Sequence, residues 1–438
     1  MDEVIKSISN FLWGWPMIIM LLGTHLYLTV RLRFPQFKIF KAIKLSLTRD
    51  KDAPGDVSQF GALATSLAAT IGTGNIVGVA TAVALGGPGA VFWCWITGVL
   101  GIATKYAEGL LAVKYRVKTR SGKMIGGPMF ALQKGLGLKW LAVLFCIFTA
   151  FASFGIGNMV QSNAITVLCH ETMQVPEWSI GLCITILAAL VILFGVKGIS
   201  RVCTALVPFM ALLYVLGCLY ILFVNIDHVV PALSLIVESA FNPSAAGGGF
   251  VGGSIILTAR YGIARGLFSN ESGMGSAPIV AAAAQTKNPV HQALVSSSGT
   301  FWDTVVICLL TGLVIVSSVL AYPEITFDDG GTLTKMAFSK IPYVGTPLLT
   351  FGIITFAFST ILGWSYYGER AVEYLGGCRM IWAYRMLYIG AIFLGSVFEL
   401  SMVWNLSDLM NALMALPNLV SLLLLSGVVL AETRRWKV

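Results

Sequence analysis

Long apolar stretches recur along the whole chain, and short polar segments separate them. About 20 apolar residues in a helix are enough to cross a hydrocarbon core of about 30 Å. Because no intervening segment is long enough for a soluble domain, the pattern predicts an all-α polytopic membrane protein with eleven transmembrane helices. The predicted spans are 11–31, 60–84, 89–113, 140–168, 178–196, 202–224, 250–285, 292–320, 344–368, 380–399 and 409–431.

Glycines and polar residues interrupt two of these spans. The second span contains "ATIGTGNIVG" (69–78), and the seventh contains "RYGIARGLFSNESGMGSAP" (260–278). A glycine inside a helix costs about 1 kcal/mol relative to alanine, and irregular backbone at membrane depth must be buried in protein or line a cavity. We therefore expect breaks near positions 72 and 268, where a bound ligand and ion replace the lost helical hydrogen bonds.

The two interrupted spans divide the chain into similar halves. After the first span (11–31), the remaining ten form two groups of five, 60–224 and 250–431, and each group opens with an interrupted member. Because five is odd, the second group must insert upside down. Matched breaks in inverted repeats point to a substrate site near the bilayer midplane. Close helix packing at a small-x-x-x-small pair is the alternative for 74–78, but it does not explain the polar residues beside the glycines in both spans.

Composition agrees with this architecture, and the distribution of charge adds an orientation. The chain is 57% hydrophobic and 11% charged, whereas soluble domains carry about 25% charged residues. Of the 29 Lys and Arg residues, 23 fall on one side of the predicted topology. The positive-inside rule then places the N-terminus outside and the C-terminus in the cytoplasm. The net charge of +9 is thus a topology signal, and no nucleic-acid partner is expected.

The chain lacks the groups that several other classes of protein need. The eight cysteines show no C-x-x-C motif and the four histidines are dispersed, so neither a disulfide framework nor a zinc or haem site is expected. An intramembrane enzyme would need a nucleophile with its base or a motif such as H-E-x-x-H, and neither is present. A phosphate-binding loop is excluded because membrane spans flank "GTGNIVG". A channel is a further possibility, and a measured transport rate far above that of carriers would favour it.

Four ionisable residues lie in or near spans, where their cost makes them functional candidates. Lys105 and Glu108 stand three residues apart on one helical face, which favours a structural ion pair. Glu271 adjoins the glycines of the seventh span. Asp303, in "FWDTVV", is a candidate to line the ion pathway or to carry a proton.

Several long motifs closely resemble one known family. They are "GTGNIVGVATAVALGGPGAVFWCWITGVLGIATKYAEGLLAVKYR", "GNMVQSN", "RGLFSNESGMGSAPIVAAAA" and "ILGWSYYGERAVEYL". The family is that of the alanine or glycine:cation symporters, the prokaryotic sodium:alanine symporters. Cys94 stands where the family usually has Met, and Ser272 where Ala is common; both changes are small.

The resemblance implies a LeuT-like fold of five plus five inverted spans after one extra N-terminal span. It also implies that sodium drives uptake of small neutral amino acids, L-alanine and glycine, across a prokaryotic plasma membrane. Some members resemble glutamine carriers, so a glutamine-selective or proton-coupled carrier is the alternative. The exact substrate, its handedness, the ion stoichiometry and the oligomeric state stay open, although a monomer is compatible with the pattern.

The resemblance also implies the residues of a substrate site. The first break would receive the substrate carboxylate, carbonyls near the second break would hold its ammonium group, and an amide and an indole would complete the pocket. The residues are Gly72, Thr73, Gly74, Asn75, Gln161, Phe268, Ser269, Asn270 and Trp364. An interhelical hydrogen bond is the alternative for Gln161, and an interfacial position is the alternative for Trp364.

A sodium site follows from the same resemblance. The paired hydroxyls of Ser359 and Thr360 would join the carbonyls of Ala68 and Ile71 beside the first break. Neutral oxygen ligands suit a hard cation. The alternative is that both hydroxyls bond back to their own helix, as is common in membranes.

Overall fold

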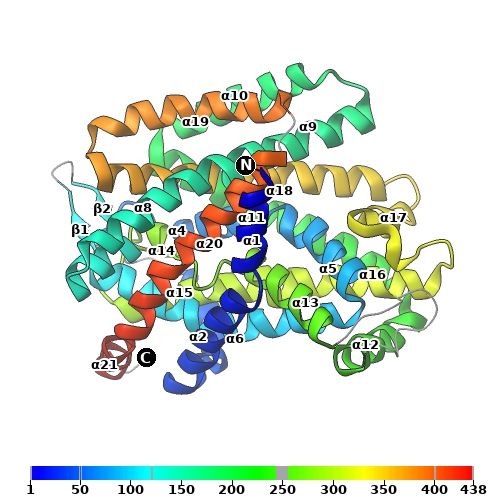
Figure 1. Cartoon of the computed structure of the whole chain (residues 1–438), viewed down its shortest axis with the longest axis horizontal. Coiled ribbons are helices and arrows are strands. Elements are labelled where there is room, and N and C mark those ends of the chain that lie inside the picture. The colour runs from blue at the N-terminus through cyan, green and yellow to red at the C-terminus, as the bar shows by residue number, and fades with distance from the viewer. Residues whose placement is uncertain are drawn as a thin grey trace.

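Helices form almost every regular element of the computed structural model (Figure 1), which describes residues 2–48, 50, 52–119, 122–242, 255–398 and 401–436. The first half comprises α1 (Asp2–Leu12), α2 (Trp15–Arg31), α3 (Ile39–Ser46), α4 (Gln59–Thr70), α5 (Val79–Gly86), α6 (Gly89–Lys114), α7 (Pro128–Phe130), α8 (Lys139–Phe154), α9 (Val160–Met173), α10 (Glu177–Ile192), α11 (Gly195–Val224) and α12 (Ile226–Phe241). The second half comprises α13 (Ile255–Asn270), α14 (Ala277–Ala281), α15 (Pro289–Thr300), α16 (Leu309–Ala321), α17 (Leu333–Ser339), α18 (Gly345–Gly376), α19 (Arg379–Val397), α20 (Ser401–Leu424) and α21 (Ser426–Arg435). Strands β1 (Val117–Lys118) and β2 (Met124–Ile125) pair antiparallel in one small hairpin.

Most of the predicted spans coincide with long apolar helices. Within the described residues, eight helices are long and apolar enough to cross a membrane, and a ninth span is the bent pair of α4 with 74–86. The predicted fifth span corresponds to α10, which has 16 residues, and the seventh to α13 and α14. Residues 250–254 of the seventh span and residue 399 of the tenth lie outside the described residues. The count of eleven therefore stays a prediction.

The first predicted break is present at the expected place. Ser58 caps the start of α4 by accepting a hydrogen bond from the Gly61 amide at 3.0 Å. The helix ends at Thr70, because Ile71 adopts an extended backbone with a ψ of 95°. The chain becomes helical again in a π-helical turn, η2 (Gly74–Gly78), that leads into α5. The two halves meet at an angle of 53°.

The second break is displaced from its predicted position near residue 268. Helix α13 continues through Asn270, and the irregular segment covers residues 271–276. Here Glu271, Gly273 and Gly275 have positive φ angles of 51°, 89° and 90°. Glycine adopts such angles without steric cost. The glycines therefore set the break together with Glu271, while Ser269 and Asn270 remain helical.

Two further π-helical segments shape the centre of the molecule. They are η4 (Gly155–Met159), between α8 and α9, and η6 (Phe301–Cys308), between α15 and α16. Such segments widen a helix and often occur at functional sites. The long helix α18 packs against α4, α8, α9 and α11, while α10 and α19 lie together along one edge of the molecule, at the top of Figure 1. Helix α18 is therefore the central wall onto which the first broken span docks.

Candidate functional site

Two cavities meet where the broken spans approach each other. The inner cavity has a volume of about 20 Å³ and the outer one about 410 Å³. Both are lined by Thr73, Gly74, Gln161 and Phe268. The rest of the inner wall consists of Ala69, Thr70, Gly72, Ile156, Ser269, Glu271, Thr360 and Trp364. The outer cavity is thus an entrance that narrows to a small chamber beside the first break.

The first break presents backbone and hydroxyl groups to this chamber. Thr73 and Gly74 are partly exposed there, at the N-terminal end of the second half-helix. The first amides of a helix lack intrahelical partners and attract anions. The Thr73 hydroxyl donates to Gln161 Oε1 at 3.4 Å, while Gln161 Nε2 donates to the Ile156 carbonyl at 3.0 Å. This end of the chamber is therefore suited to a carboxylate.

Asn75 turns away from the chamber and holds the break together. Its Oδ1 accepts a hydrogen bond from the Gly72 amide at 2.9 Å. Its Nδ2 donates to Ser269 Oγ at 3.0 Å and to Asp303 Oδ1 at 2.8 Å. Asp303 Oδ2 also accepts from the hydroxyls of Ser269, at 2.9 Å, and Thr304, at 2.6 Å. One buried network thus connects the two broken spans to η6.

The backbone of the second break is satisfied by side chains from other helices. Glu108 Oε1 accepts hydrogen bonds from the amides of Gly273 and Gly275, both at 3.1 Å. Asn418 Nδ2 donates to the same carboxylate oxygen at 2.7 Å and to the Gly273 carbonyl at 2.8 Å. Lys105 donates to the Asn270 carbonyl at 2.8 Å.

These contacts correct two expectations. Lys105 and Glu108 do not form the predicted ion pair, and among the described residues each is bonded to the second break instead. Protein side chains, rather than a ligand alone, replace many of the lost helical hydrogen bonds. The physical reason is that an unsatisfied buried amide or carbonyl costs free energy at all times, including when no substrate is bound.

Three oxygens converge where the sodium site is predicted. The Ala68 carbonyl lies 3.1 Å from Ser359 Oγ and 3.2 Å from Thr360 Oγ1. Both hydroxyls also lie within hydrogen-bonding distance of the Phe356 carbonyl, at 2.9 and 3.0 Å. A hydroxyl has one proton and two lone pairs. With the proton directed at Phe356, each hydroxyl can offer a lone pair to a cation beside Ala68.

Glycines allow the close approach that forms this site. A Cβ built on Gly72 would lie 2.8 Å from Thr360 Oγ1, and one built on Gly363 would lie 2.7 Å from the Ala69 Cβ. At Gly72 the backbone of the first broken span lies against a side chain of α18, and at Gly363 the backbone of α18 lies against a side chain of the first broken span. The side chain of Ile71 is buried and lines a separate apolar groove on another face of α4.

Aromatic residues close the chamber. Trp364 is buried, and Gly157 leaves room for it, because a Cβ at Gly157 would lie 2.3 Å from the Trp364 Cβ. The Phe268 ring packs over Gly74 at 3.5 Å, measured from the position of a Cβ built there. The Arg265 guanidinium lies 6.0 Å from the centre of the Phe268 ring. Phe268 thus separates the inner chamber from the outer cavity.

The structure brings most of the predicted site residues to one place. Gly72, Thr73, Gly74, Gln161, Phe268, Ser269 and Trp364 line the chamber, and Thr360 links it to Ser359 and Ala68. Asn75 and Asn270 do not line the chamber, since Asn75 bonds Asp303 and Asn270 Oδ1 accepts from the Ser272 amide at 2.9 Å.

Sequence reasoning did not assign a site role to several chamber residues. Ala69, Thr70 and Ile156 are apolar or common in spans, and nothing in their local sequence distinguishes them. Glu271 carried a signal, because it is ionisable and follows the polar pair before the glycines. Its Oε2 accepts a hydrogen bond from the Ser276 hydroxyl.

Several ionisable groups surround the breaks. Lys105 is the cationic group whose charge acts on all three of the buried carboxylates Glu108, Glu271 and Asp303. The described residues contain no group of three or more His, Cys, Asp or Glu that could hold a metal ion. A monovalent cation at hydroxyl and carbonyl oxygens is the chemistry that this arrangement supports.

The architecture is that of LeuT-fold secondary transporters. MhsT in complex with L-phenylalanine superposes with a TM-score of 0.53 at 14% identity, covering 86% of this chain and 99% of that one. A Na⁺-coupled sialic acid symporter gives a TM-score of 0.53 at 12% identity, covering 95% and 84%. At these identities the likeness concerns the fold alone. The model of the sodium:alanine symporter family matches residues 1–438, and the chain belongs to that family.

Curated relatives agree with this assignment. The sodium/alanine symporter AgcS of Methanococcus maripaludis is 48% identical over 440 residues, covering 99% of this chain and 96% of the relative. The probable sodium/glutamine symporter GlnT of Bacillus subtilis is 36% identical, covering 98% and 89%. The protein is therefore a multi-pass transporter of the prokaryotic plasma membrane and not an enzyme. It carries out amino-acid symport with sodium as its coupling ion.

Proposed function

We propose that the substrates are small neutral amino acids, chiefly L-alanine and glycine, taken up with sodium by alternating access. The observation that carries this proposal is an inner chamber beside the first break that residues of both broken spans line. Trp364 and Ile156 also line the chamber, and their bulk would limit the size of the substrate side chain. The 48% sequence identity with AgcS, a sodium/alanine symporter, supports the same class of substrate.

The substrate would lie between the two breaks. The amides of Thr73 and Gly74 and the Gln161 side chain would bind its carboxylate. The last carbonyls of α13, at Phe268 and Ser269, would bind its ammonium group, because the final turn of a helix leaves carbonyls without helical partners. Gly72, Asn75 and Asn270 would act indirectly by shaping the breaks.

Sodium would bind beside the substrate, at the hydroxyls of Ser359 and Thr360 and the carbonyls of Ala68 and Ile71. One positive charge crossing 100 mV contributes about 2.3 kcal/mol. A tenfold sodium gradient adds about 1.4 kcal/mol. Together, about 3.7 kcal/mol supports roughly 500-fold accumulation of substrate. One sodium ion per substrate is therefore sufficient for uptake.

The five-plus-five inverted repeat, 60–224 and 250–431, would provide the two broken spans that move against the remaining helices.

The orientation would have the N-terminus outside and the C-terminus in the cytoplasm. The outer cavity would then face outwards, since Glu171 at its mouth lies 3.8 Å from Lys335, one of the few basic residues on the predicted outer side.

Uptake of labelled alanine into proteoliposomes tests this function. We expect accumulation driven by an inward sodium gradient, with competition by glycine and serine and little competition by glutamine. Equal uptake under a pH gradient alone would contradict sodium coupling, and strong competition by glutamine would indicate a glutamine carrier. Gln161→Ala and Trp364→Ala should both weaken alanine binding, with Trp364→Ala also admitting larger side chains.

A further inference from the structure

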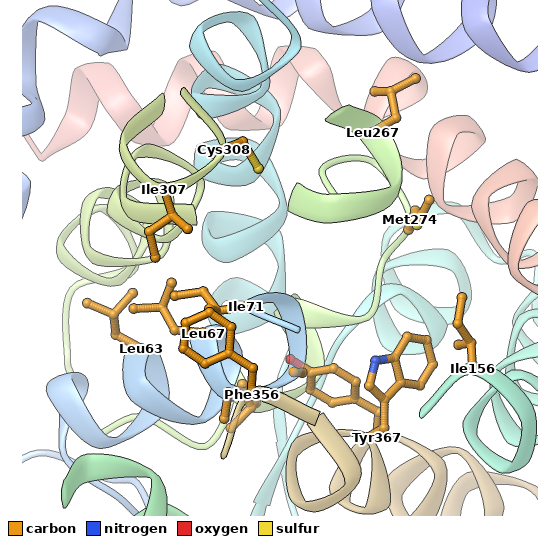
Figure 2. Packing of buried hydrophobic residues seen from close by; sticks show 14 of the residues in the cluster. Leu63, Leu67, Ile71, Ile156, Leu267, Met274, Ile307, Cys308, Phe356 and Tyr367 are labelled. Carbon is orange, nitrogen blue, oxygen red and sulfur yellow. The ribbon is translucent and has the colours of Figure 1, made fainter. Parts of the chain in front are cut away.

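An apolar groove of about 450 Å³ runs along α4, on a face that does not line the substrate chamber. Its α4 wall consists of residues at helical spacing, Phe60, Leu63 and Leu67, and Ile71 continues the wall just after the helix ends. The other walls come from α3, α11 and η6. Figure 2 shows Leu63, Leu67 and Ile71 gathered opposite Ile307. The groove is therefore a separate site that borders the first break.

The length of the groove corresponds to one leaflet of a bilayer. From Phe60 to Thr70, α4 rises about 15 Å at 1.5 Å per residue. Half of a hydrocarbon core of about 30 Å is about 15 Å. The groove begins at α3, next to the start of α4, and ends at the break, where the substrate chamber lies. An extended hydrocarbon chain from one leaflet would fit this path.

The rim of the groove is open while its floor is closed. Leu212 and Trp302 at the rim are 59% and 38% exposed, whereas Leu63 and Ile307 on the floor are 3% and 2% exposed. In a membrane, exposed side chains on the outside of the helix bundle face lipid. A lipid chain can therefore enter from the side without passing through the protein.

Helix α3, at one end of the groove, has the character of an interfacial helix. Phe40 and Leu47 are exposed, as is Phe37 just before the helix. Lys41 and Lys44 are also exposed on α3. Amphipathic helices with exposed apolar residues and lysines lie at the membrane surface and attract anionic lipids. Lys41 and Lys44 thus place positive charge on the helix that forms one end of the groove.

We propose that this groove binds one acyl chain of an anionic glycerophospholipid from the adjoining leaflet, with Lys41 and Lys44 contacting its headgroup. Because Leu67 and Ile71 border both the groove and the first break, the bound chain supports the half-helix that carries Ala68. The site goes beyond the proposed transport function and does not depend on the identity of the substrate.

Photolabelling tests the proposal on the full-length protein. Proteoliposomes would contain phosphatidylglycerol with a diazirine near the middle of one acyl chain, and labelled peptides would be mapped by mass spectrometry. We expect labels concentrated on α4, α11 and η6. Phosphatidylcholine with the same chain should label these peptides about 25-fold less, since each of the two lysines contributes a factor of about five in favour of an anionic lipid.

Two variants with matched controls probe the chain and the headgroup separately. Ala211→Phe fills the groove and should abolish labelling there, whereas Ala205→Phe, at an exposed position of the same helix, should not. The pair Lys41→Gln and Lys44→Gln should reduce labelling by phosphatidylglycerol about 25-fold. The pair Lys118→Gln and Lys134→Gln removes equal charge elsewhere and should leave labelling unchanged.

The lysine variants leave the groove itself intact, so they keep the test valid if Ala211→Phe does not fold. Labels spread evenly over all lipid-facing helices, or labelling by phosphatidylcholine equal to that by phosphatidylglycerol, would overturn the proposal. Neither result would bear on sodium-driven alanine uptake, which is measured independently.

Discussion

Glu108 Oε1 accepts the Gly273 amide at 3.1 Å across a sequence separation of 165 residues. The carboxylate belongs to the protein itself, so this hydrogen bond stabilises the irregular backbone at membrane depth whether or not a substrate is bound. The Gly275 amide and Asn418 bond the same oxygen. The second break is therefore built into the fold, and it is present before a substrate arrives.

Removal of the Glu108 carboxylate should destabilise the protein. Glu108→Ala leaves two amides and the Asn418 side chain without their acceptor, and each buried unsatisfied group costs about 1 to 3 kcal/mol. We expect a loss of about 3 kcal/mol or more, and a smaller loss for Glu108→Gln, which retains an acceptor oxygen. Thermal unfolding in detergent measures both. Glu171→Ala, at an exposed position, serves as the control, and an equal effect of all three variants would contradict the assignment.

The Thr360 hydroxyl should contribute to sodium affinity. Thr360→Ala removes one of the three oxygens that converge beside Ala68, and we expect the sodium concentration for half-maximal alanine binding to rise about tenfold, which corresponds to about 1.4 kcal/mol. Thr360→Ser should restore much of the affinity. The control is Thr355→Ala on the same helix, where the hydroxyl bonds only the carbonyls of Phe351 and Gly352. Unchanged sodium dependence in Thr360→Ala would argue for a purely structural hydroxyl.

A methyl group at position 363 should disturb the same site sterically. The new Cβ of Gly363→Ala would lie 2.7 Å from the Ala69 Cβ and 2.9 Å from its amide nitrogen. This contact pushes the end of α4 away from α18, and we expect sodium-dependent binding to weaken about tenfold or more. Gly352→Ala is the matched control, since its Cβ would meet only Tyr214, at 3.9 Å. Equal binding by the two variants would show that α4 tolerates the displacement.

Arg116 should hold closed the end of the molecule opposite the outer cavity. It donates to the carbonyls of Ala282, Ala284 and Thr286, after the second broken span, and of Pro54, before the first. Arg116→Ala should therefore speed amide hydrogen exchange in residues 54–57 and 282–286. Arg435→Ala removes an exposed guanidinium and is the control. Exchange unchanged by Arg116→Ala would indicate that other contacts keep this end shut.

The ion pair between Lys114 and Glu432 should make stability depend on pH. Lys114 Nζ lies 2.5 Å from Glu432 Oε1, and this hydrogen bond lowers the pKa of the Glu432 carboxyl from its ordinary value of 4.5. Because the pKa is lower in the folded state, the stabilisation is complete above the ordinary pKa and is lost as the pH falls through the folded value. Glu432→Gln should melt at a lower temperature than the parent protein at neutral pH, and the difference should vanish in acid. A difference that does not depend on pH would contradict this.

The spans and the first break could be predicted from local sequence. Apolar length decides whether a helix crosses a bilayer, and that property needs no partner. Similarly, the "GTGN" segment places polar groups and glycines together, so the helix ends at Thr70 as the pattern indicates. The second break was misplaced because Ser269 and Asn270, the polar pair after Phe268, carried the signal, while the positive φ angles belong to residues 271, 273 and 275.

The sequence by itself determined that the chain crosses a membrane repeatedly and where two of its helices weaken, because hydropathy and glycine content act within one segment. Only the tertiary structure decided which groups complete those helices. Asn75 meets Asp303 across 228 residues, and Glu108 binds the second break rather than Lys105. Buried polar groups must find partners wherever the fold places them, and those partners come from helices that local sequence cannot bring together.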